Sequence, residues 1–373
     1  MSRFIFAVII LSSIYAEDYY KGDALIKKGV YAFYNYNFDE AVDILEEARD
    51  KFPEHPGVHL IWAASRWVRA QANKPIEETY HILQADLNEI VPIYNELVMR
   101  YEYDYNYSLY KGSTIGLYAR LSLGKKDWLK TFYHAYKGFL IINEVTKRST
   151  NIIDSQLPIG IVEYYAGISK SIFRWAIKLY DLQPSTESGL HRISLAADHG
   201  HWSWIEAKAI LCNLYLWVEN EPILSLEHAQ DLAKNFPQNF YFNLLYLESL
   251  IRTDNIDQSL ILLKKMENSI DLLTRKQIDW YKPYLLYEKA LLNFYQKQYS
   301  NALDLVTMAI NDYKAELDII LGNAYLLQGM IYDKLYRRAE AKESYYNCIN
   351  LDNFSGSIQK AKLYLKQPFY KIK

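Results

Sequence analysis

The sequence predicts an all-α protein built from a series of short helical hairpins. Glycine and proline are scarce, at 14 and 10 of 373 residues, whereas a sheet-rich fold needs many tight turns. Apolar residues in 161–182 and 277–299 recur every three or four positions, which is the period of an amphipathic helix. Small residues also recur at fixed separations, and these separations divide the chain into hairpin-sized units.

The clearest unit spans about residues 22–55. Ala41 follows Gly29 after 12 residues, Ala48 comes seven later, and Pro53 five after that. A glycine or alanine where two helices cross lets their backbones approach closely, and proline ends the second helix because it has no backbone N–H to donate. This spacing resembles the tetratricopeptide repeat (TPR) family, whose unit is a helix–turn–helix of about 34 residues.

Copies of this pattern recur in the second half of the chain. Ser225 and Ser259 lie 34 residues apart and mark two degraded units. The small residues of the two better copies are, in order, Ala290, Ala302, Ala309, Gly329, Ala341 and Cys348. The resemblance implies a right-handed superhelical solenoid of TPR-like helical hairpins, in which the first helix of each hairpin lines the concave side.

We therefore predict four segments. Residues 1–16 form a signal peptide, 17–75 hold N-terminal TPR-like hairpins, 76–200 form an irregular helical centre, and 201–373 hold C-terminal TPR-like repeats with a capping helix. The centre resembles that of exported bacterial repeat proteins related to tetratricopeptide-39-like proteins, a resemblance that carries no known active site. The residues that support it are Gly112, Gly116, Ala119, Trp128, Gly160, Tyr164, Tyr165, Gly167, Gly189, Ala196, Ala197 and Gly200.

Local signals place several helix ends. Ser203 with Glu206 has the spacing of a capping box that opens a helix, and Gly200 ends the preceding helix. Asn37 with Glu40 offers the same device. Three prolines suit the first turn of a helix, namely Pro75, Pro184 and Pro222.

One segment alternates in the manner of a strand. Residues Tyr101–Tyr107 place a tyrosine at every second position, but no second such run exists to pair with them. We therefore predict an extended connection there, followed by a helix over 108–123.

The amino end indicates export. Arg3 precedes an apolar run from Phe4 to Leu11, and small residues lead to Ala16, so we predict a signal peptide that is cleaved after Ala16. The alternative is an uncleaved tether, because Ile14 fits the small-x-small cleavage pattern poorly. We expect no transmembrane segment in the mature chain, and a periplasmic or secreted location.

The two cysteines, Cys212 and Cys348, fall at small inward-facing positions of the helical pattern. We expect buried, inert thiols there, with a disulfide between them as the alternative that export would permit.

Composition and motifs give no support for catalysis or for a cofactor. The net charge of −2 removes the electrostatic basis for nucleic-acid binding, and no phosphate-binding loop or zinc motif occurs. The best metal candidate is a cluster of His191, Asp198, His199 and His201, for which a helix terminus is the simpler explanation. We therefore expect a protein that is not an enzyme and holds no metal or cofactor.

Tyrosine is unusually abundant, with 35 residues, and aromatic side chains suit recognition surfaces. The main hypothesis is an exported scaffold that binds a protein or peptide partner in a concave groove. The alternative is a helical receptor for a small ligand or glycan that uses exposed aromatic rings. The groove positions that the TPR resemblance implies are Tyr34, Trp217, Tyr241, Tyr284, Tyr287 and Phe294.

Overall fold

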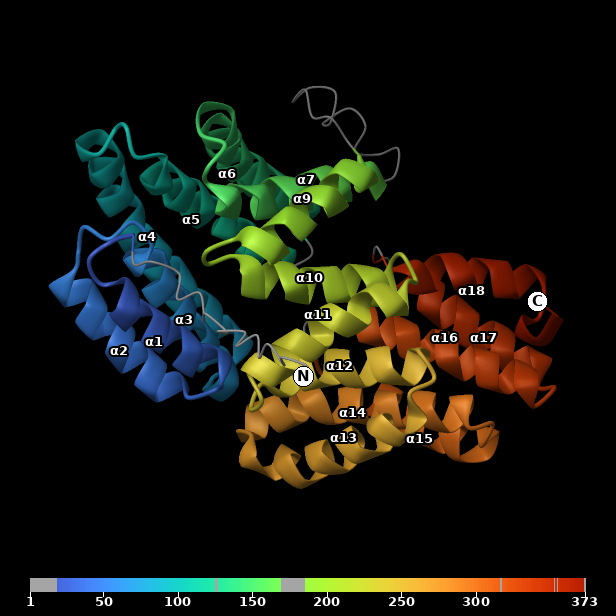
Figure 1. Cartoon of the computed structure of the whole chain (residues 1–373). Coiled ribbons are helices and arrows are strands. Elements are labelled where there is room, and N and C mark those ends of the chain that lie inside the picture. Colours follow the sequence, from blue (N-terminus) through green and yellow to red (C-terminus); the bar gives the residue numbers. More distant parts are fainter. Residues whose placement is uncertain are drawn as a thin grey trace, which may run out of the picture.

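The computed structural model of the chain describes residues 19–124, 127–168, 185–315, 317–351, 353 and 355–371 (Figure 1). All regular structure within these ranges is helical, which confirms the predicted all-α class. The predicted signal peptide and Pro184 lie outside the described residues. None of the described helices combines the length and apolar character needed to cross a bilayer.

The helices pack in consecutive pairs, as predicted for a series of hairpins. The last helix, α18 (Gly356–Lys366), packs on the final pair as a cap. The pairs are α1 (Asp23–Tyr34) with α2 (Phe38–Lys51), α3 (Val58–Asn73) with α4 (Ile76–Arg100), α5 (Tyr105–Leu123) with α6 (Trp128–Arg148), α7 (Gln156–Ile168) with α9 (Thr186–His199), α10 (Trp204–Trp217) with α11 (Pro222–Asn235), α12 (Phe240–Arg252) with α13 (Ile256–Ser269), α14 (Arg275–Tyr295) with α15 (Tyr299–Asn311), and α16 (Ile319–Lys334) with α17 (Arg338–Asn350).

One turn geometry recurs between paired helices. After α1, the Tyr36 N–H donates to the Phe33 carbonyl at 3.1 Å and the Asn37 N–H donates to the Ala32 carbonyl at 3.0 Å. This pair of bonds is a Schellman motif, and it recurs after α12, α14 and α16. The turn residues are non-glycine residues with positive φ, namely Tyr36, Asp254, Lys297 and Tyr336. The repeat predicted from small residues is therefore also a repeat of turn geometry.

Small residues lie where paired helices touch. A Cβ added at Gly29 in α1 would lie 2.6 Å from Leu45 Cγ in α2, and a Cβ at Gly329 in α16 would overlap Tyr345 in α17. Ala41 and Cys348 are fully buried at the corresponding crossings. The spacing argument from the sequence is confirmed at these contacts.

Helices α4, α5 and α6 are longer than the two helices of the first hairpin. Helices α4, α5 and α6 have 25, 19 and 21 residues, compared with 12 and 14 in the first hairpin. Gly138 of α6 faces Gly112 and Gly116 of α5, so the two backbones are in contact. Gly189 of α9 meets the Gly160 carbonyl of α7 in the same way. These glycines serve close helix packing.

The segment 101–107 differs from the prediction. Helix α5 begins at Tyr105, and only a short turn separates it from α4. The Asp104 carboxylate accepts the Asn106 N–H at 3.0 Å and so caps α5. Tyr101 stacks on Tyr107 with ring centroids 4.6 Å apart, so the alternating tyrosines serve a helical corner and not an extended strand.

The predicted capping boxes also differ in detail. Helix α10 begins at Trp204 as expected, but the Ser203 hydroxyl donates to the Asp154 carboxylate at 2.7 Å, and no side-chain cap bond forms. Asn37 likewise precedes α2 without capping it. Pro222 is in the first turn of α11, whereas Pro75 stands one residue before α4. At Ser203 a long-range contact therefore replaces the local cap, whereas Pro222 lies where the sequence predicts it.

The first hairpins contact helices from the middle of the chain. In Figure 1 the chain leaves α1–α4, passes through the centre, and returns along α10, so that α12 and α14 end beside the first hairpins. Thr274, just before α14, donates to the Ala72 carbonyl of α3. The turn between α1 and α2 reaches α10 and α12, as described below. Contacts between segments about 200 residues apart therefore join the first hairpins to the middle of the stack.

Gly138→Ala tests the glycine contact between α5 and α6. The added methyl would lie 2.6 Å from the Gly112 carbonyl oxygen, so the backbones must separate, at a cost of about 1–3 kcal/mol of unfolding free energy. Gly116→Ala is the matched control, because its Cβ would meet nothing within 4 Å. The control should gain up to about 1 kcal/mol from helix propensity. Urea unfolding measures both, and equal effects would contradict this packing.

Candidate functional site

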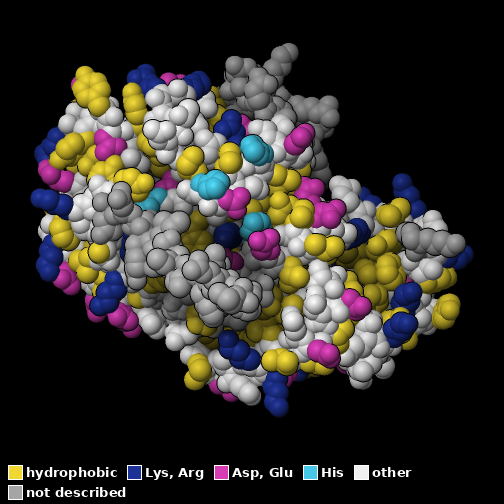
Figure 2. Space-filling view, in the orientation of Figure 1, with side chains coloured by type: hydrophobic (Ala, Val, Ile, Leu, Met, Phe, Trp, Pro, Cys, Tyr) yellow, Lys and Arg dark blue, Asp and Glu magenta, His cyan; other side chains and the backbone are white. Residues whose placement is uncertain are grey.

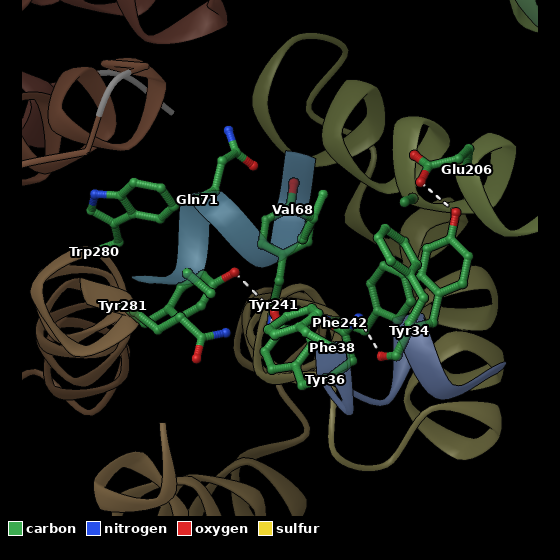
Figure 3. Close-up of a pocket in the computed structure, with 15 residues that line it drawn as sticks. Tyr34, Tyr36, Phe38, Val68, Gln71, Glu206, Tyr241, Phe242, Trp280 and Tyr281 are labelled. Atoms are coloured by element: carbon green, nitrogen blue, oxygen red, sulfur yellow. Dashed lines mark hydrogen bonds between the residues drawn. The ribbon is translucent and has the colours of Figure 1, made fainter. Parts of the chain in front are cut away.

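A cavity of about 210 Å³ lies where the first hairpins meet α10, α12 and α14 (Figure 3). Its wall is mostly aromatic, and it combines residues 33–72 with residues 206–281. The α1–α2 turn and α3 form one side, and α10, α12 and α14 form the other. The lining residues are Phe33, Tyr34, Tyr36, Phe38, Val68, Gln71, Ala72, Glu206, Ala209, Asn239, Tyr241, Phe242, Gln277, Trp280 and Tyr281.

Tyr34 joins α1 to two helices of the second half. Its hydroxyl donates to Glu206 of α10 at 2.5 Å, and its backbone carbonyl accepts from Asn239 Nδ2 at 2.9 Å. Its ring stacks on Phe242 with centroids 5.9 Å apart. Glu206 is an exposed residue and Tyr34 is half-buried, so solvent reaches this bond.

Tyr36 makes a second junction. Its hydroxyl lies 2.9 Å from the Tyr281 hydroxyl of α14, and it accepts the Tyr241 N–H of α12 at 3.3 Å. That N–H belongs to the first turn of α12, where no intrahelical acceptor exists. The positive φ of 67° at Tyr36, which the Schellman turn requires, turns the side chain toward α14. The repeat geometry thus positions this contact.

Val68, Gln71 and Trp280 also line the cavity and are half-buried, whereas Glu206 is its exposed lining residue. Figure 3 shows Gln71 and Trp280 on the side of the cavity away from the Tyr34–Glu206 bond. Gln277 beside them is already engaged, because it forms a capping box with Thr274 at the start of α14. An incoming group would therefore meet one indole, one amide and an aliphatic side chain.

The structure brings two of the predicted groove residues to this cavity, Tyr34 and Tyr241. Tyr284 and Phe294 are partly buried against the large C-terminal core. Trp217 and Tyr287 lie inside that core, at 6% and 4% exposed, so they present no surface to a partner in this structure. The sequence identified the aromatic stripe but did not show which of its members remain accessible.

Sequence reasoning missed a buried acidic pair next to that stripe. Glu248 of α12 and Glu288 of α14 are each 1% exposed. Glu248 accepts from Trp217 Nε1 at 2.8 Å and from Arg252 at 3.1 Å, whereas neither oxygen of Glu288 has a hydrogen-bond partner among the described residues. Burial, and then the Glu248 charge, raise the pKa of Glu288 well above its usual range. The sequence signal that could have predicted this pair is a glutamate at an otherwise apolar position of each helix.

A second buried pair, His55 with Asp23, resembles a catalytic dyad, but both ring nitrogens of the histidine are already hydrogen-bonded within the protein. His55 Nε2 lies 2.7 Å from Asp23 Oδ1, and the Gly57 N–H donates to His55 Nδ1 at 3.0 Å. Because Nδ1 accepts a hydrogen bond, the ring proton is on Nε2 and is donated to Asp23. Both side chains are buried, so this pair fastens α1 to the loop before α3.

The histidine cluster does not assemble into a metal site. Across the described residues, no three His, Cys, Asp or Glu side chains come close enough to hold an ion. His191, Asp198 and His199 are exposed on α9, and the His201 ring packs edge-on against Tyr19 and Trp202. Gly200 follows α9 as predicted.

Both cysteines are free and buried, as expected. Burial raises the pKa of Cys212 to about 12 and of Cys348 to about 11, so neither is a reactive thiolate.

Glu288→Gln tests the buried acid, since it keeps the side-chain shape and removes the charge. A raised pKa in the folded state means that folding takes up a proton, so wild-type stability falls as pH rises from about 4.3 toward the raised pKa. We expect the variant to match the wild type near pH 4. Within that window it should then gain up to about 1.4 kcal/mol per pH unit over the wild type.

Urea unfolding between pH 4 and 8 measures the difference. The exposed Glu46→Gln on α2 is the control and should show no such trend. A difference between Glu288→Gln and the wild type that stays constant with pH would contradict the assignment.

No family model matches the chain, and no curated protein matches it. Among solved structures, a tetratricopeptide repeat protein from Parabacteroides merdae is 12% identical, with 92% of this chain and 97% of that chain covered, at a TM-score of 0.33. Yeast Tom70 is also 12% identical, with 93% and 87% covered, at a TM-score of 0.34. The chain is similar to these two proteins in fold only, as a TPR-like series of helical hairpins.

Proposed function

We propose that this protein is an exported, non-enzymatic scaffold that binds a protein or peptide segment at the cavity between the first hairpins and α10, α12 and α14. The observation that carries the proposal is the wall of this cavity, which is mostly aromatic and is built from the first hairpins together with α10, α12 and α14. A partner seated there would contact both halves of the stack at once.

The size and charge of the cavity favour one side chain of a peptide. About 210 Å³ is less than the roughly 300–1,000 Å³ that encloses a drug-sized ligand. Glu206 is the one charged lining residue, and its carboxylate already accepts a hydrogen bond from the Tyr34 hydroxyl. Figure 2 shows acidic and basic side chains scattered over the face of the molecule that it draws. Recognition would therefore depend on packing, with an apolar or aromatic anchor residue.

The glycan-receptor alternative has weaker support. A sugar site needs exposed rings in a deep pocket, whereas the hydroxyls of Tyr34, Tyr36 and Tyr241 are all bonded within the protein. Trp280 is the one half-buried indole that lines the cavity.

Selection of a random linear peptide library on the purified chain tests the binding proposal. Binders should lose at least tenfold in affinity on Trp280→Ala, which corresponds to about 1.4 kcal/mol, because a central aromatic dominates such interfaces. Tyr346→Ala on α17 is the control, since this side chain is 56% exposed and distant in sequence from the cavity residues. Binders that are indifferent to Trp280→Ala would contradict the proposed site.

Export is tested separately by expressing the chain with its native start in a bacterium. We expect the protein outside the cytoplasm with Glu17 as its first residue, because cleavage is proposed after Ala16. Membrane-bound protein that retains Met1 would favour the tether. Full-length protein that remains in the cytoplasm would contradict export.

A further inference from the structure

The turn between α1 and α2 sits on the second half of the molecule as a bound segment would. We call residues 33–38 the first-hairpin turn, and we call the side chains of α10, α12 and α14 that meet it the receiving face. The receiving face consists of Glu206, Asn239, Tyr241, Phe242 and Tyr281. The contacts join residues 172, 205 and 245 positions apart, so the turn approaches this face as a separate piece of chain.

The bonds in this contact are those that recognise a peptide. Asn239 Nδ2 donates to a main-chain carbonyl of the turn, at Tyr34. Glu206 accepts the Tyr34 hydroxyl. The Tyr36 hydroxyl bonds to the Tyr281 hydroxyl and accepts the Tyr241 N–H. The rings of Tyr36 and Tyr281 are stacked, 6.4 Å apart with their planes at 13°. The face therefore selects a carbonyl flanked by aromatic rings with polar tips.

The turn can leave this face without unfolding its own hairpin. The crossing of α1 and α2 is held by Gly29 against Leu45, and both helices pack on α3 in the N-terminal core, while Val30 of α1 also contacts the large C-terminal core. Tyr34 and Tyr36 are only half-buried, and the cavity beside them shows that packing around the turn is incomplete.

We infer that the receiving face is a peptide-recognition surface whose resident occupant is the first-hairpin turn, and that a protein partner carrying a tyrosine-rich turn displaces this occupant. The inference rests on the proposed function and names the chemistry of the partner. As a tethered competitor, the resident turn has a high effective concentration, so it lowers the apparent affinity of any partner.

The probe is a labelled synthetic peptide of residues 30–40, and the test variant is Tyr34→Phe with Tyr36→Phe. The variant keeps both rings and loses both hydroxyls, so the resident turn is weakened while the receiving face is unchanged. We expect the peptide to bind the variant at least tenfold more tightly than the wild type. Tyr103→Phe, on an 85% exposed side chain, is the control and should bind like the wild type.

Hydrogen exchange on the wild type supplies a second measurement that needs no variant. Excess peptide should speed amide exchange in residues 33–38 of the chain and leave the α5–α6 pair unchanged. Unaltered exchange in 33–38, together with equal peptide binding by the wild type and the variant, would overturn the inference. A dimer of the variant formed by exchanging first hairpins would also overturn it, because the occupant would then be a second copy.

The two proposals fail in different ways. Library binders that depend on Trp280 but do not alter exchange in 33–38 would preserve the scaffold and refute displacement. Binding of peptide 30–40 without any library binder that depends on Trp280 would support displacement and refute Trp280 as the anchor of the proposed site.

Discussion

The close approach of paired helices is the constraint on which the rest of the structure depends. Where Gly29 faces Leu45, or where Gly138 faces Gly112, the helices come nearer than larger side chains would permit. This distance sets the angle of each hairpin and leaves little freedom in how the next one stacks. Each hairpin then presents its first helix to the inside of the stack, where the aromatic residues of α10, α12 and α14 meet.

A second regularity follows from the first. Hairpins that cross in the same way need the same turn, and the Schellman bonds after α1, α12, α14 and α16 supply it without glycine. A non-glycine residue in the left-handed region costs about 1 kcal/mol, which each site accepts. At Tyr36 the same turn also directs the aromatic side chain toward α14. A turn that the hairpin requires therefore also lines the candidate site.

The inside of the stack is not an empty groove. Trp217 and Tyr287 bury their rings and bond to Glu248, and the neighbouring Glu288 is buried as well. The first-hairpin turn covers a further part of the concave side. The cavity beside Trp280 is lined from both parts of the molecule, and this is why the proposed binding site lies at the joint between them.

The sequence by itself determined the all-α class and the hairpin units, because helical periods and small-residue spacings are local patterns. It also indicated buried cysteines. Only the tertiary structure decided that Tyr34 meets Glu206 and that Tyr36 meets Tyr281, since no local pattern relates residues 172 or 245 positions apart. The same reason explains why Ser203 binds Asp154 in place of its predicted cap: a distant carboxylate competed with the local bond.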